Sequence, residues 1–359
     1  MKRYIIDGRS IVERTTGISR YSIELLKGYV RRFGADNVTV ILMNGISLGI
    51  CKEIHTSYDR YKLFDIIKFS YMLYNMEYDV YHSGDLIGPI FRKRNVQHIL
   101  TVHDLMYLVV PSFLGASTIR TKLQIWKSKI IDVLKLRVAD RIISISQTTA
   151  NDLRRIMGLN SIVLREGCNK LPCSNNYRCN RKELLNLRQN DFFLYVGLGY
   201  PHKNIQFMIN AFMNAKITKK LVICGKKHPL SANQYENVIF TGWISDEDLD
   251  YLYKRCAAFV FPSLYEGFGL PILEALSYKK KVLSSNAGSL SEFSTEFVSF
   301  FDPHNEKELS MLMENVDNIK LDCKALTKYL EYFDWKNIWD EYHNTFNVEK
   351  DENNKVIYT

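Results

Sequence analysis

Apolar and polar positions alternate along the first half of the chain with two different periods. Short runs rich in β-branched and aromatic residues predict strands at residues 3–7, 37–43, 78–83, 98–104 and 141–146. Segments 16–33 and 118–138 carry apolar residues at helical spacing. The runs ILTV and IISI are continuously apolar, which is typical of parallel strands covered on both faces. Strands that alternate with helices predict an α/β fold.

The same alternation begins again after a polar stretch at residues 170–188. The second set of strand-like runs covers residues 191–197, 220–225, 237–243, 257–263 and 281–285. Helical patterns lie between them at residues 203–215, 245–256 and 270–278. We therefore predict two Rossmann-like, doubly wound domains, over residues 1–175 and 185–330, that face each other across a cleft. Ligands of such sheets bind at the carboxyl ends of the strands.

A last amphipathic helix is predicted in segment 331–359, with four large residues on one face: Trp335, Ile338, Trp339 and Tyr342. The length of 359 residues agrees with two domains, since single cores stop growing at about 250–300 residues. We find no internal repeat.

The composition indicates the cellular compartment of the protein. No apolar run approaches the ~20 residues needed to cross a bilayer. Asp7, Gly8 and Arg9 interrupt the apolar start, which predicts a strand and not a signal peptide. The only cysteine cluster, Cys168, Cys173 and Cys179, matches no zinc-binding spacing. We expect a cytoplasmic protein with reduced thiols.

The net charge of +9 is unevenly placed. Residues 1–170 carry 26 Lys and Arg against 15 Asp and Glu, so the N-terminal half holds the whole basic excess. This excess would suit nucleic acid, an anionic membrane surface or an acidic substrate. No aromatic and basic interleaving supports nucleic acid, so we expect no nucleic-acid partner.

The helical segment 118–138 concentrates this charge around Leu123, Trp126 and Ile130, and the run FRKRN at 91–95 adds three more charges. The basic residues of the segment are Arg120, Lys122, Lys127, Lys129, Lys135 and Arg137. We expect the patch to attach the protein to the inner face of the cytoplasmic membrane. The alternative is a core-packed helix with a solvated basic face, and for Trp126 itself we expect core packing.

Residues 259–277, FVFPSLYEGFGLPILEALS, place a helix start between two glutamates. Pro271 suits the first helical position, so the helix begins near Leu270 and its free N–H groups form an anion site. Glu266 and Glu274 would repel a simple phosphate. They would accept hydrogen bonds from the hydroxyl groups of a nucleotide sugar whose diphosphate binds at the start of the helix. The alternative is that each glutamate only stabilises the helix dipole.

A second motif supports the nucleotide sugar. YPHKN places Lys203 between a strand end and a helix start, where its charge can reach a diphosphate. The spacing is neither a P-loop nor a dinucleotide fingerprint. The alternative is a solvated lysine at a helix start.

Several motifs, in this order along the chain, carry a family resemblance: TGISRY (16–21), TVHD (101–104), LREGCN (164–169), VGLGYPHKN (196–204) and the long block 237–276. The chain resembles the retaining glycosyltransferases of the E-x7-E group, family 4, of the GT-B fold. The long block is the most specific part, whereas the His-Asp pair alone would be a weak signal. Relatives carry basic residues where Leu198 and His202 stand here.

The resemblance implies roles for particular residues. Glu266 would hold the donor sugar, Glu274 the ribose, and Lys203 the diphosphate leaving group. His103 would contact the donor sugar or the reaction centre, whereas Asp104 is better explained as a cap. The other donor-binding positions would be Gly17, Gly267, Phe268, Gly269, Leu270, His202, Trp243 and Ile244. No metal and no cofactor is implied.

The resemblance also implies a reaction. A retaining hydrolase of the two-carboxylate type places its nucleophile about 5 Å from its acid partner, and the sequence offers no clear nucleophile. We expect front-face attack, in which the departing diphosphate helps to take the acceptor proton. The first domain would bind the acceptor, and the last helix would cross back onto that domain.

The predicted function is transfer of a hexose, with GDP-mannose favoured as donor, to a glycan or a polyprenyl-diphosphate-linked acceptor in O-antigen or capsule synthesis. One alternative is a transferase with a soluble acceptor, or a glucan synthase that uses UDP- or ADP-glucose. A non-enzymatic alternative is a nucleic-acid-binding protein. The sequence leaves the donor base, the acceptor and the linkage open.

Overall fold

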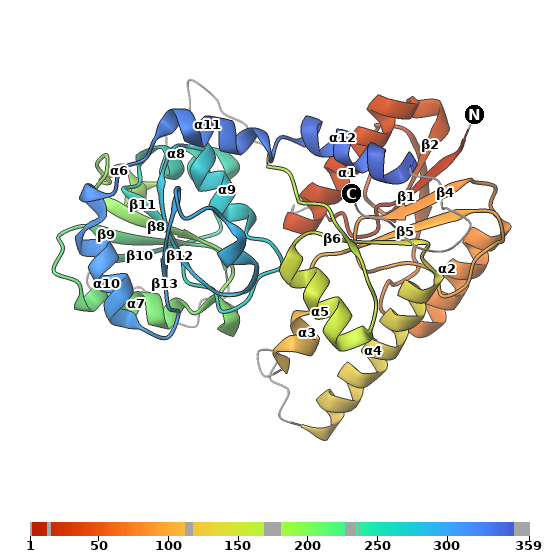
Figure 1. The fold of residues 1–359 in the computed structure, drawn as a ribbon, viewed down its shortest axis with the longest axis horizontal. Coiled ribbons are helices and arrows are strands. Elements are labelled where there is room, and N and C mark those ends of the chain that lie inside the picture. Colours follow the sequence, from red (N-terminus) through yellow and green to blue (C-terminus); the bar gives the residue numbers. More distant parts are fainter. Residues whose placement is uncertain are drawn as a thin grey trace.

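The computed structural model describes residues 2–12, 16–111, 118–168, 181–226, 235 and 237–347. The two sheets lie in separate domains, side by side in Figure 1. Cys173 and Cys179 and much of the polar stretch at 170–188 lie outside these residues. In the described part of the chain, no helix is both long and apolar enough to cross a membrane.

The first sheet has seven parallel strands in the order β3-β2-β1-β4-β5-β6-β7. Its strands are β1 (Tyr4–Asp7), β2 (Val38–Met43), β3 (Lys52–Thr56), β4 (Val80–Ser83), β5 (Gln97–Val102), β6 (Arg141–Ser144) and β7 (Ile162–Val163). The accompanying helices are α1 (Gly17–Phe33), α2 (Leu63–Asn75), α3 (Met106–Val109), α4 (Ile119–Val138) and α5 (Gln147–Met157). The predicted strands and both predicted helices are confirmed, whereas β3, β7, α2, α3 and α5 were not predicted.

The second sheet has six parallel strands in the order β10-β9-β8-β11-β12-β13. Its strands are β8 (Phe192–Val196), β9 (Lys220–Cys224), β10 (Val238–Gly242), β11 (Ala258–Phe261), β12 (Lys281–Ser285) and β13 (Val298–Phe301). Its helices are α6 (Lys182–Leu185), α7 (Ile205–Asn214), α8 (Asp246–Arg255), α9 (Leu270–Ser277), α10 (Glu306–Glu314) and α11 (Cys323–Glu331).

In both sheets the strand order reverses at one place, between β1 and β4 in the first and between β8 and β11 in the second. Such a switch point leaves a crevice at the carboxyl ends of the strands, where ligands of open α/β sheets bind. The predicted fold class, two doubly wound α/β domains, is therefore confirmed.

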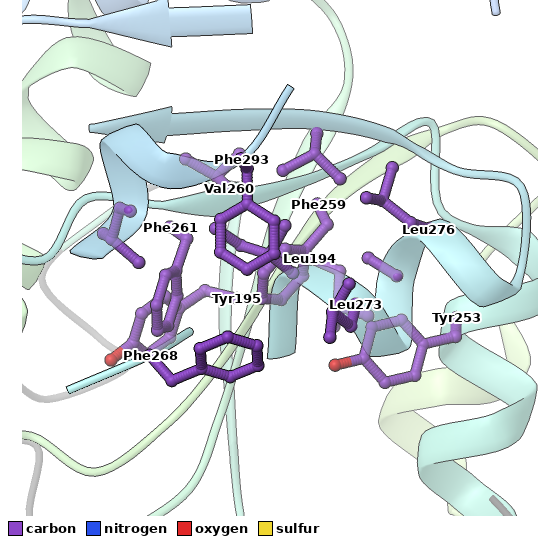
Figure 2. Packing of buried hydrophobic residues seen from close by; sticks show 14 of the residues in the cluster. Leu194, Tyr195, Tyr253, Phe259, Val260, Phe261, Phe268, Leu273, Leu276 and Phe293 are labelled. Atoms are coloured by element: carbon purple, nitrogen blue, oxygen red, sulfur yellow. The ribbon is translucent and has the colours of Figure 1, made fainter. Parts of the chain in front are cut away.

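The core of the second domain holds the motif loop in place. Phe259 and Phe261 of β11 belong to one buried cluster with Leu273 of α9, and Phe268 of the intervening loop packs near Phe293 (Figure 2). All five side chains are buried. Because the loop between β11 and α9 is held at both ends and by Phe268, the segment that carries Glu266 has a defined position.

Helix α12 (Trp335–Asn347) lies over the first domain, although it follows α11 of the second (Figure 1). The Tyr342 hydroxyl lies 2.5 Å from the Tyr21 hydroxyl of α1, and the Trp339 ring packs edge-on against Tyr29. A Cβ at Gly28 would lie 1.5 Å from the Trp339 ring, so this glycine makes room for the tryptophan. The chain therefore crosses between the domains a second time.

Candidate active site

A cavity of about 510 Å³, here named the donor cavity, lies between the two domains at the switch points. Ser10 follows β1, Asp85 follows β4, and Glu266 follows β11. The volume falls in the range of small-molecule sites, about 300–1,000 Å³. Nine of the predicted site residues line it: Gly17, His103, Lys203, Glu266, Gly267, Phe268, Gly269, Leu270 and Glu274.

Lys203 and Glu266 form an ion pair in this cavity. The Lys203 Nζ atom lies 2.6 Å from Oε1 of Glu266, and both side chains are largely buried. Lys203 ends a short 3₁₀ turn after β8, and Glu266 lies in the loop before α9. The Lys203 ammonium group can bind a diphosphate, and the Glu266 carboxylate can accept a hydrogen bond from a sugar hydroxyl group.

Helix α9 begins at Leu270, as predicted, and Gly269 precedes it with a φ of 112°. That backbone conformation is unfavourable for residues with a Cβ, and a Cβ at Gly269 would lie 2.7 Å from Leu290. At Gly267 a Cβ would lie 2.2 Å from the carbonyl oxygen of His103. Gly267 therefore allows close contact between the two domains, a role that the sequence did not reveal.

Glu274 is buried one turn inside α9. Its Oε1 accepts a hydrogen bond from Arg20 at 2.7 Å, and its Oε2 accepts one from the Tyr253 hydroxyl at 3.0 Å. Burial raises the pKa of this carboxyl, and the Arg20 charge opposes the rise. Arg20 also contacts Asp246 at 3.3 Å, so one arginine of the first domain holds two carboxylates of the second.

Glu166 is a further carboxyl in the donor cavity that our sequence reasoning did not single out. Its side chain is only 4% exposed, and it accepts no hydrogen bond among the described residues. Burial raises its pKa to about 8, the Glu274 charge adds to the rise, and Arg20 opposes it. Both Glu166 and Arg20 lie within motifs that carried the family resemblance, LREGCN and TGISRY, which was the available signal.

His103 follows β5 and is buried at the cavity wall. Its Nε2 lies 2.8 Å from the Gly84 carbonyl oxygen, to which it donates, and this leaves Nδ1 as an acceptor in the neutral ring. Asp104 accepts a hydrogen bond from the Met106 N–H at 2.9 Å, in the turn that leads into α3. It also lines the cavity, and burial raises its pKa.

Three predicted donor-binding residues do not line the cavity. His202 is buried in the 3₁₀ turn, where burial lowers its pKa to about 4. Trp243 is exposed after β10, and its carbonyl oxygen accepts a hydrogen bond from Arg181. Ile244 packs at the edge of the core. By contrast, a Cβ at Gly17 would meet nothing within 4 Å, so the start of α1 is open to a ligand.

Solved structures of other proteins have the same fold. The sucrose-phosphate synthase of Thermosynechococcus elongatus superposes with a TM-score of 0.73 over 96% of this chain and 98% of its own, at 18% sequence identity. The chain therefore has the GT-B fold.

A family model matches part of the sequence. Residues 178–331 match the family described as "Glycosyl transferases group 1". The match covers less than half of the chain and includes the motif block 237–276, so the second domain is similar to this family.

Named relatives are mannosyltransferases of Escherichia coli. The serotype-specific mannosyltransferase WbdA is 32% identical over 227 residues, which is 55% of this chain and 28% of WbdA. The O-antigen chain mannosyltransferase B is 27% identical over 82% of this chain and 85% of its own length. The match to WbdA thus spans less than a third of that relative.

Proposed function

We propose that the protein is a retaining, metal-independent hexosyltransferase of surface-polysaccharide synthesis, with GDP-mannose as donor and a glycan or lipid-linked acceptor. The observation that carries this proposal is the single cavity in which Lys203, Glu266 and Glu274 meet the N-terminus of α9. The family supports a nucleotide-sugar donor. The names of the relatives support mannose and an O-antigen product.

The donor diphosphate would lie at the N-terminus of α9 beside Lys203, where backbone N–H groups and an ammonium group meet an anion. Glu266 would accept hydrogen bonds from sugar hydroxyls, and Glu274 would use its remaining lone pairs for the ribose. Nδ1 of His103 would accept a hydrogen bond from one further hydroxyl group of the sugar. Each of these side chains lines the donor cavity.

In the proposed reaction, the bond from the anomeric carbon to the diphosphate oxygen breaks, and the acceptor oxygen bonds that carbon on the same face. The acceptor proton passes to the departing diphosphate, whose growing charge Lys203 stabilises. Glu266 is paired with Lys203, which suits a role in holding the sugar more than a role as nucleophile. The protein contributes positioning and charge stabilisation.

Nucleotide binding tests the proposal first. The purified chain is titrated with GDP, UDP, ADP and their hexose conjugates in the presence of a chelator, and thermal unfolding is followed. A ligand at 100 times its Kd stabilises the native state by about 2.7 kcal/mol. We expect GDP-mannose to raise the melting temperature, and Lys203→Ala to abolish the rise.

Lys219→Ala is the matched control, since Lys219 pairs with Asp317 away from the cavity. If no nucleotide stabilises the chain, the proposal is wrong. If only UDP-glucose or ADP-glucose raised the melting temperature, the donor sugar would be glucose and not mannose. NMR of the product anomeric proton then decides between retention and inversion.

Attachment to an anionic membrane is also part of the proposal. Trp126 is 59% exposed, so the prediction that it packs in the core is wrong. The exposed apolar residues on α4 are Ile119, Leu123, Trp126, Ile130 and Leu134. Their spacing puts them on one side of the helix, and Arg120, Lys122 and Lys127 flank them. Apolar side chains bordered by basic ones suit an anionic lipid surface.

A further inference from the structure

A second cavity of about 490 Å³, here named the α4 groove, lies in the first domain beside the donor cavity. Helix α4 forms one wall and contributes Thr121, Gln124, Ser128 and Asp132. Five residues line both cavities: Ile18, Tyr61, Asp85, His103 and Asp104. The groove therefore leads directly to the proposed place of the donor sugar.

Helix α4 presents different chemistry to its two sides. Seven residues of α4 line the groove, and five of them, at positions 121, 124, 128, 132 and 135, are polar or charged, whereas Ile125 and Ile131 are apolar. The exposed apolar residues recur at positions 119, 123, 126, 130 and 134. At 100° per residue these two sets lie on opposite sides of the helix. The groove side of α4 is thus mostly polar, whereas its outer side carries exposed apolar residues.

Two carboxylates lie where the cavities join. Asp85 accepts a hydrogen bond from the Leu86 N–H at 2.7 Å through Oδ1, and Asp104 accepts one from Met106 through its own Oδ1. Neither Oδ2 atom accepts a hydrogen bond within the described residues. Asp85 and Glu266 are both close enough to Asp104 for their charges to act on it. Carboxylate oxygens with unused lone pairs accept hydrogen bonds from hydroxyl groups.

The groove is acidic although its domain is basic. Asp85, Asp104 and Asp132 line it against one cation among its described residues, Lys135. Lys135 is buried, and its Nζ lies 3.1 Å from Asp132 and 3.4 Å from the Leu86 carbonyl oxygen. It is therefore already neutralised. A phosphate would be repelled from such a groove, whereas an uncharged polyol would be accepted.

The exposed basic side chains of α4 lie outside the groove. Arg120, Lys122 and Lys127 are exposed on α4, and none of them lines the groove. These three charges lie on the outer side of α4, beside its exposed apolar residues.

We infer that the α4 groove binds the uncharged, growing end of a glycan acceptor, and that Asp85 and Asp104 hold the hydroxyls of its terminal sugar. This inference rests on the proposed function, because it takes the neighbouring cavity as the donor site. Earlier sugars of the acceptor lie along Gln124 and Ser128. A diphosphate carrier, where the acceptor has one, lies outside the groove. The acceptor is accordingly a chain that already carries several neutral sugars.

Direct binding to the full chain tests the inference. Saturation-transfer NMR is recorded, with the stabilising nucleotide present, for mannotriose, maltotriose and β-1,4-galactotriose, and for mannose 6-phosphate. We expect at least one neutral trisaccharide to bind and mannose 6-phosphate not to compete with it. Gln124→Ala and Asp85→Asn should each weaken trisaccharide binding about tenfold, as loss of a hydrogen bond to a ligand does.

Gln206→Ala is the matched control, since Gln206 is exposed on α7 of the second domain and lines neither cavity. Because Gln124 is exposed on a helix surface, its variant tests the groove even where Asp85→Asn does not fold. Three results overturn the inference: no neutral trisaccharide binds, mannose 6-phosphate competes for the site, or Gln124→Ala binds like the control. Nucleotide stabilisation is measured separately, so its absence overturns the proposed function, whereas its presence without groove binding overturns only this inference.

Discussion

At the scale of single residues, the donor cavity brings together ionisable groups that are far apart in the sequence. Arg20 of the first domain contacts Glu274 and Asp246 of the second, and Glu166 lies buried beside them. A buried carboxyl that accepts no hydrogen bond is costly to ionise. Perturbed groups of this kind cluster at functional sites, which supports the assignment of the cavity.

Replacement of Glu166 by Gln tests the cost of this burial. The pKa of Glu166 is raised to about 8, so the folded state retains its proton where the unfolded state loses it. Stability therefore falls as pH rises from the ordinary glutamate value of about 4.3 to about 8. Glu166→Gln removes this loss of stability. The melting temperature of the variant should therefore rise relative to that of the wild type as pH rises through this range.

The measurement is the difference in melting temperature between the two proteins at pH 5 and pH 8. Glu274, Arg20, Tyr21 and Tyr342 surround Glu166 in both proteins, so the difference reports on Glu166. An equal difference in melting temperature at pH 5 and pH 8 would mean that the pKa of Glu166 is ordinary.

Gly267 gives a second prediction at this scale. In Gly267→Ala, the new Cβ meets the carbonyl oxygen of His103 at 2.2 Å, and a backbone atom cannot turn away as a side chain can. Overpacking of this kind costs about 1–3 kcal/mol, so the free energy of unfolding should fall by that amount. Gly17→Ala is the comparison, because its Cβ meets nothing within 4 Å and its unfolding should be unchanged. Equal denaturant midpoints for the two variants would contradict the prediction.

At the scale of elements, α4 is an unusual helix because its outer side carries exposed apolar residues and its groove side is mostly polar. Core-facing helices of soluble domains show the reverse arrangement. Helix α2 adds Phe64, Ile67 and Tyr71 as exposed residues, and Tyr61, just before it, also lines the groove. Exposed apolar side chains gathered on such elements mark interaction surfaces.

The outer side of α4 makes a prediction that vesicle sedimentation can check. A double variant, Leu123→Ser and Trp126→Ser, loses apolar area that would enter the lipid interface, so it should bind vesicles containing phosphatidylglycerol at least about tenfold more weakly. Met311→Ser is the control, because Met311 is exposed on α10 of the second domain. If the double variant bound vesicles as well as the wild type, α4 would not contact the membrane. Added salt should weaken vesicle binding of the wild type, because salt screens the basic side chains.

At the scale of the whole molecule, the two domains meet through a few polar contacts around the cavity. The Glu292 carboxylate accepts hydrogen bonds from the backbone N–H groups of Gln147 and Thr148, at 3.0 and 2.7 Å, at the start of α5. On the same side, the Tyr265 hydroxyl donates to Asp152 at 2.8 Å. Because the cavity is lined from both domains, these contacts help to set its width.

Glu292→Gln should therefore favour an opened molecule. The variant keeps the shape of the side chain but loses a negative charge at a helix N-terminus, which is worth about 0.3–1 kcal/mol at an exposed site. Small-angle scattering should show a larger radius of gyration, and nucleotide affinity should fall by a factor of about 2–5. Glu296→Gln, an exposed neighbour, is the control. Identical scattering from both variants would mean that Glu292 does not hold the domains together.

Much of this architecture could be predicted because it depends on local periodicity. The run DFFLYVG became β8 and the pattern after Leu270 became α9, because strand and helix periods are written in adjacent residues. Strand β3 was missed because KEIHT carries few apolar residues for an edge strand. In the site, Lys203, Glu266 and Glu274 could be selected because each stands at a strand end or a helix start.

The sequence by itself therefore determined the elements, their α/β alternation and the strand-end residues that carry the proposed chemistry. Only the tertiary structure decided that Arg20 holds Glu274, that Gly267 touches His103, and that α4 turns its polar side to an acidic groove. The physical reason is distance along the chain. These contacts join residues that lie far apart in sequence or in different domains, and domain packing, which no local pattern records, brings them together.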